Sequence, residues 1–283
     1  MQLMKKKKGI IILCVAIFIV IFSYTQNNLL STTKITVRSG MLPSTFDGYK
    51  IVQLSDLHSK QFGKNQTRLV KRVETERPNI IVFTGDLVDQ KKADEESNIT
   101  LMKKLANIAP TYFVTGNHEF WSGNAAEIEK AVQQVGVNVL RNGYERIEKG
   151  GEEIYIAGMD DPAIMEDSSG ESIAVEDNLQ KVLDGVSEDA YTILLSHRPE
   201  MFSIYQQQNI DLIFSGHAHG GQLRLPFLGG LVAPDQGLFP EYTAGKYIEN
   251  DSVLIVNRGL GNSIIPQRIF NRPEIVSVTL ERE

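Results

Sequence analysis

The sequence predicts an α/β fold in which largely parallel strands alternate with helices and a second sheet packs on the first. Short apolar runs bounded by turn residues are typical of buried strands, and six of them lie at 50–55, 80–84, 112–115, 154–158, 192–196 and 211–215. Helical patterns occupy 65–76 and 125–135, and Gly136 follows the second where glycine commonly ends a helix. Three later strands, 222–225, 253–257 and 274–279, follow without helices between them, and we expect them in the second sheet.

The first 24 residues predict a membrane anchor. Four lysines, Lys5 to Lys8, precede an uncharged apolar stretch from Gly9 to Tyr24. Sixteen helical residues span about 24 Å, slightly less than the ~30 Å core of a bilayer, and snorkelling lysines with local thinning can close that gap. A cleaved signal peptide is the alternative, but residues 22–32 contain no A-x-A-like cleavage site. We therefore expect an uncleaved single-pass signal-anchor.

Charge gives the expected orientation and excludes one class of partner. The positive-inside rule keeps the lysines in the cytoplasm and places the domain on the extracytoplasmic face of the cell membrane. Without those four lysines, 25 basic residues face 35 acidic ones, a net charge of −10. An acidic domain disfavours nucleic acid, because neutralisation of phosphates supplies most of that affinity.

We expect three segments along the chain: the anchor at 1–24, a polar stalk at 25–33, and one domain at 34–283. The stalk has the sequence TQNNLLSTT and reaches about 30 Å if it is extended at ~3.3 to 3.6 Å per residue. Cys14, the single cysteine, lies inside the apolar run, so disulfides within the domain are excluded.

Polar side chains that can bind metals follow the predicted buried strands. They are Asp56, His58, Asp86, Asn117, His118, His197, His217 and His219, and they include all five histidines of the chain. Imidazole, carboxylate and amide oxygen together suit borderline and hard divalent metals. Ligands of an open α/β sheet bind beyond the carboxyl ends of its strands, so we expect these side chains in one crevice along a line of strand ends.

The motifs around these residues resemble those of the calcineurin-like metallophosphoesterases. They are Asp56-Leu57-His58, Gly85-Asp86, Gly116-Asn117-His118-Glu119, Ser196-His197 and Gly216-His217-Ala218-His219, and the likeness covers nearly all of 48–280. The continuation is similar to the membrane-anchored bacterial branch, the YaeI and YkuE type, at Gly220-Gly221-Gln222, Arg258-Gly259-Leu260-Gly261, Arg268 and Pro273-Glu274. The resemblance implies a four-layer α-β-β-α sandwich of two mixed sheets.

The resemblance also implies a role for each candidate residue. Asp56, His58 and His219 would hold one divalent ion, Asn117, His197 and His217 a second, and Asp86 would bridge both; Mn, Fe and Zn all remain open. Two such ions acidify a shared water and hold phosphate oxygens. His118 is left without a metal and would act as the catalytic histidine, protonating the leaving oxygen or stabilising charge on the phosphoryl group.

Three functions follow as hypotheses. The first is a membrane-anchored phosphodiesterase or pyrophosphatase acting on a lipid-linked or cell-envelope phosphoester, similar to relatives that hydrolyse UDP-diacylglucosamine. A protein or small-molecule phosphomonoesterase is the second, although Gln90 stands where the protein phosphatase signature has arginine. The third is a non-catalytic, metal-stabilised envelope-binding module, against which the intact His118 and full ligand set argue.

The sequence leaves two interpretations for several further residues. Asp89 and Glu119 could orient a histidine or be solvated carboxylates, and Arg224, Arg258 and Arg268 could bind phosphate or pair with acids, the structural interpretation being favoured. The segment 223–242 is rich in glycine and proline yet apolar. It could be a covered loop or an apolar rim for an acyl chain, opposite Phe120 and Trp121.

Overall fold

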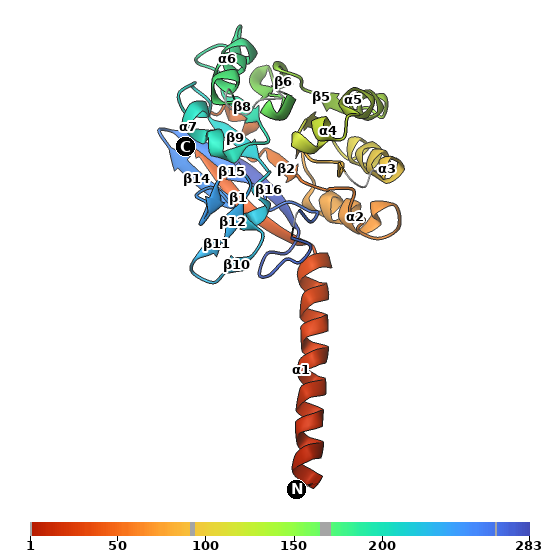
Figure 1. Cartoon of the computed structure of the whole chain (residues 1–283). Coiled ribbons are helices and arrows are strands. Elements are labelled where there is room, and N and C mark those ends of the chain that lie inside the picture. The colour runs from red at the N-terminus through yellow and green to blue at the C-terminus, as the bar shows by residue number, and fades with distance from the viewer. Residues whose placement is uncertain (1, 91–93, 165–170, 264) are drawn as a thin grey trace.

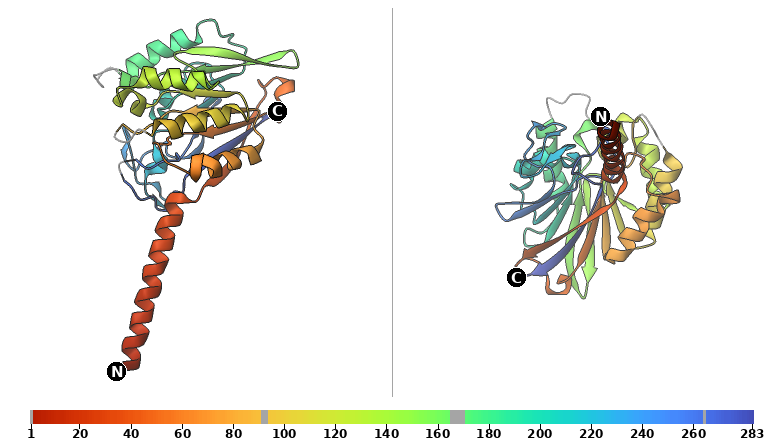
Figure 2. Two further views of the ribbon diagram at one scale, coloured as in Figure 1. Left: turned by 90° about the vertical axis from the view of Figure 1, so that its right-hand side faces the viewer. Right: turned by 90° about the horizontal axis from the view of Figure 1, so that it is seen from below.

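The computed structural model describes residues 2–90, 94–164, 171–263 and 265–283. Two six-stranded sheets stack face to face, and helices cover the outer face of each (Figure 2). A long helix extends away from this domain at the N-terminal end (Figure 1). The layers confirm the predicted α-β-β-α sandwich of two mixed sheets.

The first sheet carries four neighbouring parallel strands, and the carboxyl ends of three of them lie side by side. Its strand order is β1 (Ser31–Ser39), β16 (Glu274–Arg282), β2 (Lys50–Leu54), β3 (Ile80–Thr84), β4 (Thr111–Val114) and β5 (Asn138–Val139). Strands β2 to β5 are mutually parallel, and β16 is antiparallel to β2 and parallel to β1. Leu54 pairs with Phe83 and Thr84 with Val114, so the chain leaves β2, β3 and β4 along one edge.

The second sheet repeats this arrangement. Its order is β14 (Gly245–Glu249), β15 (Ser252–Val256), β9 (Leu212–Ser215), β8 (Thr192–Leu195), β7 (Glu152–Gly158) and β6 (Gly143–Lys149). The four inner strands are parallel and the two outer ones antiparallel to their neighbours. Leu195 pairs with Phe214 and Val256 with Ser215, which brings the ends of β8 and β9 together.

Alternation along the strands separates three apolar cores, because successive side chains of a strand point to opposite faces. In β3, Ile80 and Val82 pack between the two sheets, whereas Ile81 and Phe83 face the outer helices. A third core lies outside the second sheet. The helices of the domain are α2 (Thr67–Glu76), α3 (Glu95–Ala106), α4 (Asn117–Trp121), α5 (Ala125–Gln134), α6 (Glu171–Leu183) and α7 (Phe202–Tyr205). Gly136, at φ 89°, follows α5 as predicted.

The placement of the later strands differs from the prediction. Strand β15 joins the second sheet, but β16 inserts between β1 and β2 of the first sheet. The reason is packing: Val276 and Val278 of β16 face the core between the sheets beside Ile51 of β2. The strands β7, β8 and β9, in turn, belong to the second sheet. Residues 222–225 contribute only the short strand β10 (Arg224–Leu225), which pairs with β11 (Gly229–Gly230).

The segment predicted as a polar stalk is not extended over its whole length. Helix α1 (Gln2–Asn28) runs through its first four residues, and β1 begins at Ser31. Asn27 Nδ2 donates to the Pro266 carbonyl, and Ser23 Oγ donates to Gln267 Oε1, so these polar side chains fix the helix end to the domain. Lys5–Asn28 is long and apolar enough to cross a membrane, and its 24 residues span about 36 Å.

Candidate metal centre

The eight predicted metal-site residues all lie at one end of the stacked sheets. Asp56 and His58 follow β2, Asp86 follows β3, Asn117 and His118 begin α4, His197 follows β8, and His217 and His219 follow β9. Strand ends of both sheets therefore supply the residues, rather than the single line of strand ends that the sequence led us to expect. All except His118 are buried.

Close approach of the connecting loops brings the side chains together. A Cβ atom on Gly85 would lie 2.6 Å from His197 Nδ1, and one on Gly116 would lie 2.3 Å from Asp86 Oδ1. Glycine is therefore required at both positions, because a Cβ atom at either would collide with a side chain of the site. His217 and His219 adopt left-handed φ angles of 63° and 48°, an uncommon conformation for such residues that turns both rings into the same site.

One group of side chains combines Asp56, His58, Asp86 and His219. His58 Nε2 lies 3.0 Å from His219 Nε2, and His219 Nε2 lies 3.3 Å from Asp56 Oδ1. The Oδ2 atom of Asp86 is 3.5 Å from His58 Nε2. Each residue thus turns one ligand atom toward a common point.

A second group combines Asp86, His197 and His217. His197 Nε2 lies 3.2 Å from His217 Nδ1 and 3.3 Å from Asp86 Oδ2. His197 Nδ1 contacts the Thr84 carbonyl at 2.7 Å, which leaves Nε2 free to bind a cation. Asn117 Oδ1 is buried without a hydrogen-bond partner. Asp86 Oδ2 faces both groups.

The donor set fits divalent cations. Two nitrogen ligands about 2.1 Å from one ion are separated by about 3.0 to 3.4 Å, which matches the two imidazole pairs. Burial lowers the pKa of His58 to about 4 and that of His219 well below its usual value, so both rings are neutral, the form that binds metals. Burial alone would raise the pKa of Asp86, but the neighbouring imidazoles, His197 foremost, hold it well below its usual range.

Glu119 supports the site through backbone groups, a role that the sequence did not predict. Its side chain is fully buried. The Oε2 atom accepts from the N–H groups of Asp86 at 2.9 Å and Gly116 at 2.7 Å, and Oε1 accepts from that of Val88 at 3.2 Å. One carboxylate therefore ties the loop after β3 to the start of α4, and it neither orients a histidine nor faces solvent.

His118 stands beside the two groups of ligands with one ring nitrogen engaged. Its Nδ1 accepts from the Gln90 N–H at 3.2 Å, which places the ring proton on Nε2. The ring contacts His58 at 4.4 Å and Trp121 at 5.4 Å between centroids. Asp89 shares this corner with His58 and His118.

The three arginines that sequence reasoning left open have structural partners. Arg268 is buried and donates to the carbonyls of Gly261, Arg258 and Asn271. Arg258 pairs with Glu274 at 2.6 Å. Arg224 donates to the Gly220 carbonyl at 2.8 Å and to Thr243. None of the three is among the residues described around the metal crevice.

Asp235 and Arg198 belong to the site although sequence reasoning did not select them. Asp235 Oδ2 accepts from His217 Nε2 at 2.9 Å and from Arg198 Nη1. Arg198 is buried and holds Asp161 through two hydrogen bonds of 2.7 and 3.0 Å. A carboxylate on the outer nitrogen of His217 fixes the tautomer that leaves Nδ1 free for a cation.

The ligand groups open into a crevice of about 310 Å³. Its described walls are formed by Asp86, Asp89, Gln90, Asn117, His118, Trp121, His217, His219, Pro234 and Ser263. Phe227 and Leu228 are exposed and lie outside this wall, so these two residues are neither covered nor part of the rim of the crevice.

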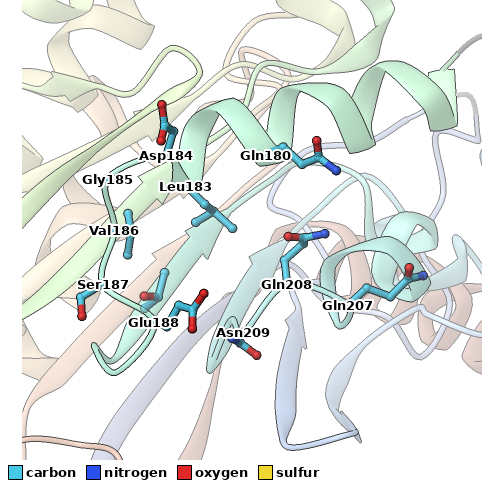
Figure 3. Close-up of a pocket in the computed structure, with 11 residues that line it drawn as sticks. Gln180, Leu183, Asp184, Gly185, Val186, Ser187, Glu188, Gln207, Gln208 and Asn209 are labelled. Atoms are coloured by element: carbon cyan, nitrogen blue, oxygen red, sulfur yellow. The ribbon is translucent and has the colours of Figure 1, made fainter.

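Another cavity, of about 390 Å³, lies at the opposite ends of β8 and β9 (Figure 3). Polar side chains from the end of α6 and from the loop before β9 line it, among them Gln180, Asp184, Glu188, Gln207 and Asn209. No residue of the two ligand groups contributes to it, so the chemistry belongs to the crevice.

The sandwich and its buried carboxylates and imidazoles define a metal-dependent hydrolase, and comparison with known proteins gives the family. Residues 49–221 match the model of the calcineurin-like phosphoesterases. The metallophosphoesterase YkuE of Bacillus subtilis (strain 168) is 31% identical over 263 residues, covering 91% of this chain and 88% of that protein. A metallophosphoesterase of Aquifex aeolicus (strain VF5) is 30% identical over 275 residues, covering 94% and 98%. The chain belongs to the calcineurin-like phosphoesterase family and is a metal-dependent phosphoester hydrolase.

A vertebrate relative bears on the N-terminal helix. The transmembrane protein with metallophosphoesterase domain of Danio rerio is 30% identical over 251 residues, 85% of this chain and 55% of that protein. This chain thus spans about half of that relative's length. The relative's name and the apolar helix α1 together support membrane anchoring.

Proposed function

We propose that the chain is a single-pass membrane phosphodiesterase or pyrophosphatase that uses two divalent ions and acts on lipid-linked or cell-envelope phosphoesters. The observation that carries the two-ion proposal is the position of Asp86, whose Oδ2 lies 3.5 Å from His58 Nε2 and 3.3 Å from His197 Nε2. One carboxylate oxygen between two sets of nitrogen ligands suits a pair of cations about 3.5 to 4 Å apart.

In this proposal Asp56, His58 and His219 hold one ion, and Asn117, His197 and His217 hold the other. When bound, the pair supplies Lewis acidity, which draws charge from the phosphoryl oxygens and acidifies water. The identity of the metals among Mn, Fe and Zn is open, because imidazole, carboxylate and amide ligands suit each of them.

The protein's own groups then orient the ester and donate hydrogen bonds to it. The Asp86 Oδ1 atom accepts from the His118 N–H at 2.9 Å, which fixes the start of α4 against the ligand loop. His118 carries its proton on Nε2 and lines the crevice, so the neutral ring can donate a hydrogen bond to the departing oxygen or to the phosphoryl group. Complete proton transfer to the departing oxygen would require the imidazolium, which carries a second proton on Nδ1. Trp121, 54% exposed, supplies an apolar wall.

The described lining of the crevice suits diesters better than monoesters, because it supplies no cationic side chain. Its described lining residues include Asp86 and Asp89 but no lysine or arginine. A monoester dianion would therefore find no cationic side chain of the protein for its second charge, whereas a diester monoanion needs only the bound ions. We therefore expect kcat/KM for bis-p-nitrophenyl phosphate to exceed that for p-nitrophenyl phosphate by tenfold or more in the full-length protein loaded with Mn²⁺.

A lipid-linked pyrophosphate presented in mixed micelles completes this test. The proposal expects turnover of that substrate by wild type and its loss in His118→Ala. A preference for the monoester would replace the diesterase by the phosphomonoesterase alternative, and metal binding without turnover of any ester would leave the non-catalytic binding module.

The proposed topology has its own test. With Lys5 to Lys8 in the cytoplasm, a reporter fused after Glu283 should be exported, and alkaline carbonate should fail to extract the protein. Recovery of a shorter soluble form that lacks these lysines would favour a cleaved signal peptide instead.

A further inference from the structure

Large apolar side chains are exposed at the turns of segment 223–242. Their exposed fractions are 41% for Leu225, 107% for Phe227, 65% for Leu228, 76% for Leu238 and 70% for Phe239. Residues 225–234 contain no charged side chain. Clustered exposed apolar residues of this kind mark an interaction surface in soluble domains, and no charge opposes transfer of residues 225–234 into an apolar medium.

Fold stability does not account for these residues. The segment is held at its base, where Leu231 N–H donates to the carbonyls of Gly221 and Leu223 at 3.1 and 2.9 Å. Phe227 and Phe239 stand in turns with left-handed φ angles of 69° and 55°. Glycine or asparagine is favoured in that conformation, and a bulky residue is an outlier. An aromatic side chain at such a turn is better explained by a contact outside the domain.

The end of α1 lies against a neighbouring loop that also exposes an aromatic side chain at a left-handed φ angle. Phe270 is 52% exposed at φ 51°, and its ring meets that of Phe22 at 5.5 Å between centroids. Lys60 Nζ donates to the Asn27 carbonyl at 2.5 Å, and Asn271 N–H donates to Gln26. The last turns of the apolar helix are therefore fixed to the domain, and Phe270 stands at the level where the apolar stretch ends.

Both views of the chain place β10 and β11 at the same end of the domain as the exit of α1 (Figures 1 and 2). A bilayer that contains α1 would meet this end of the domain first. The surface of a bilayer is also broad enough to contact several separate turns at once. A single acyl chain, in contrast, needs an enclosing groove, and Phe227 and Leu228 lie outside the crevice wall.

We propose that Phe227, Leu228, Leu238, Phe239 and Phe270 insert into the interface of the bilayer that anchors α1 and seat the domain on it. Apolar and aromatic side chains on surface elements enter the headgroup and acyl boundary in this way in other interfacial proteins. The crevice wall includes Pro234 from the same segment and Ser263 from the loop beside Phe270. Insertion of these side chains therefore places the mouth of the crevice beside the lipid headgroups. The proposal rests on the membrane anchoring but not on the proposed substrate.

Site-specific fluorescence on the full-length chain tests this surface. In a Cys14→Ser background, Phe227→Cys and Phe239→Cys are each labelled with an environment-sensitive nitrobenzoxadiazole dye. The matched control is Ile173→Cys, since Ile173 is 67% exposed on α6, at the far end of the domain from α1 (Figure 1). Each variant is reconstituted into vesicles of phosphatidylcholine and phosphatidylglycerol.

We expect blue-shifted emission at 227 and 239, with quenching by spin-labelled acyl chains several-fold stronger than by aqueous iodide. The label at 173 should be quenched more strongly by aqueous iodide than by the spin-labelled acyl chains. Iodide access at 227 and 239 equal to that at 173 would overturn the proposal, as would protection from both quenchers, which would indicate a contact between proteins. Because no ester is hydrolysed in this measurement, its failure and that of the proposed activity are separate results.

Discussion

Replacing Asp235 by asparagine tests whether the segment 223–242 controls the metal site. Asp235 stands at a φ of 57°, a conformation that asparagine tolerates, so the backbone is preserved. The change removes the negative charge that faces His217 Nε2 at 2.9 Å. Arg198 keeps both of its hydrogen bonds to Asp161, and we expect the thermal midpoint to stay near that of wild type.

Loss of a carboxylate partner from a metal-binding histidine typically costs 10- to 100-fold in metal affinity or activity. The side chain of Asp235 is 52% exposed, so water can replace part of its interaction, and the lower end of that range applies. We therefore expect about tenfold weaker binding of one ion, or about 1.4 kcal/mol.

Chelator competition with the full-length protein measures this change directly. Asp177→Asn is the matched control, because Asp177 is exposed on α6 and belongs to neither ligand group. Unchanged affinity in a folded Asp235→Asn protein would show that Asp235 does not position His217.

Three further changes test separate parts of the site and fold. His118→Ala should retain its metal by elemental analysis while turnover falls by roughly 10² to 10⁴, the range for loss of a general acid or base. Glu119→Ala leaves three buried N–H groups without an acceptor, so the free energy of unfolding in urea should drop by about 3 kcal/mol or more, with partial recovery in Glu119→Gln. Burial raises the pKa of Asp211 from 3.8 to about 6. The protonated carboxyl of Asp211 therefore stabilises the fold below about pH 4, and this contribution to the free energy of unfolding is lost as the pH rises through about 6. In urea titrations, the stability of Asp211→Asn relative to wild type should rise between these two pH values.

The candidate site was predictable because its residues follow short apolar runs. A buried strand must end at a turn, and polar residues such as Asp56, Asp86 and His197 directly after such runs converge wherever strand ends meet. The pattern does not state which sheet a strand joins. Burial on both faces makes β8 and β2 equally apolar, so the division of ligands between two sheets required the structure.

Residues that act through contacts with distant parts of the chain could not be recognised from the sequence. Asp235 lies in a segment of glycine and proline, 18 positions from the histidine that it contacts. The sequence suggested Glu119 as a possible partner of a histidine, but its carboxylate oxygens accept hydrogen bonds from N–H groups of a loop more than 30 positions away. Strand β1 was missed because its Thr and Ser residues were interpreted as a stalk, although Ile35 and Val37 alternate with charged residues.

Metal content measured together with turnover in Asp86→Ala tests the central claim most directly. Asp86 offers one oxygen to both ligand groups, so its removal should affect both ions at once. We expect two divalent ions per wild-type chain, with ion content and phosphodiester turnover both collapsing in Asp86→Ala and both retained in Asp177→Ala. Two ions and full turnover in Asp86→Ala would contradict the shared two-metal centre.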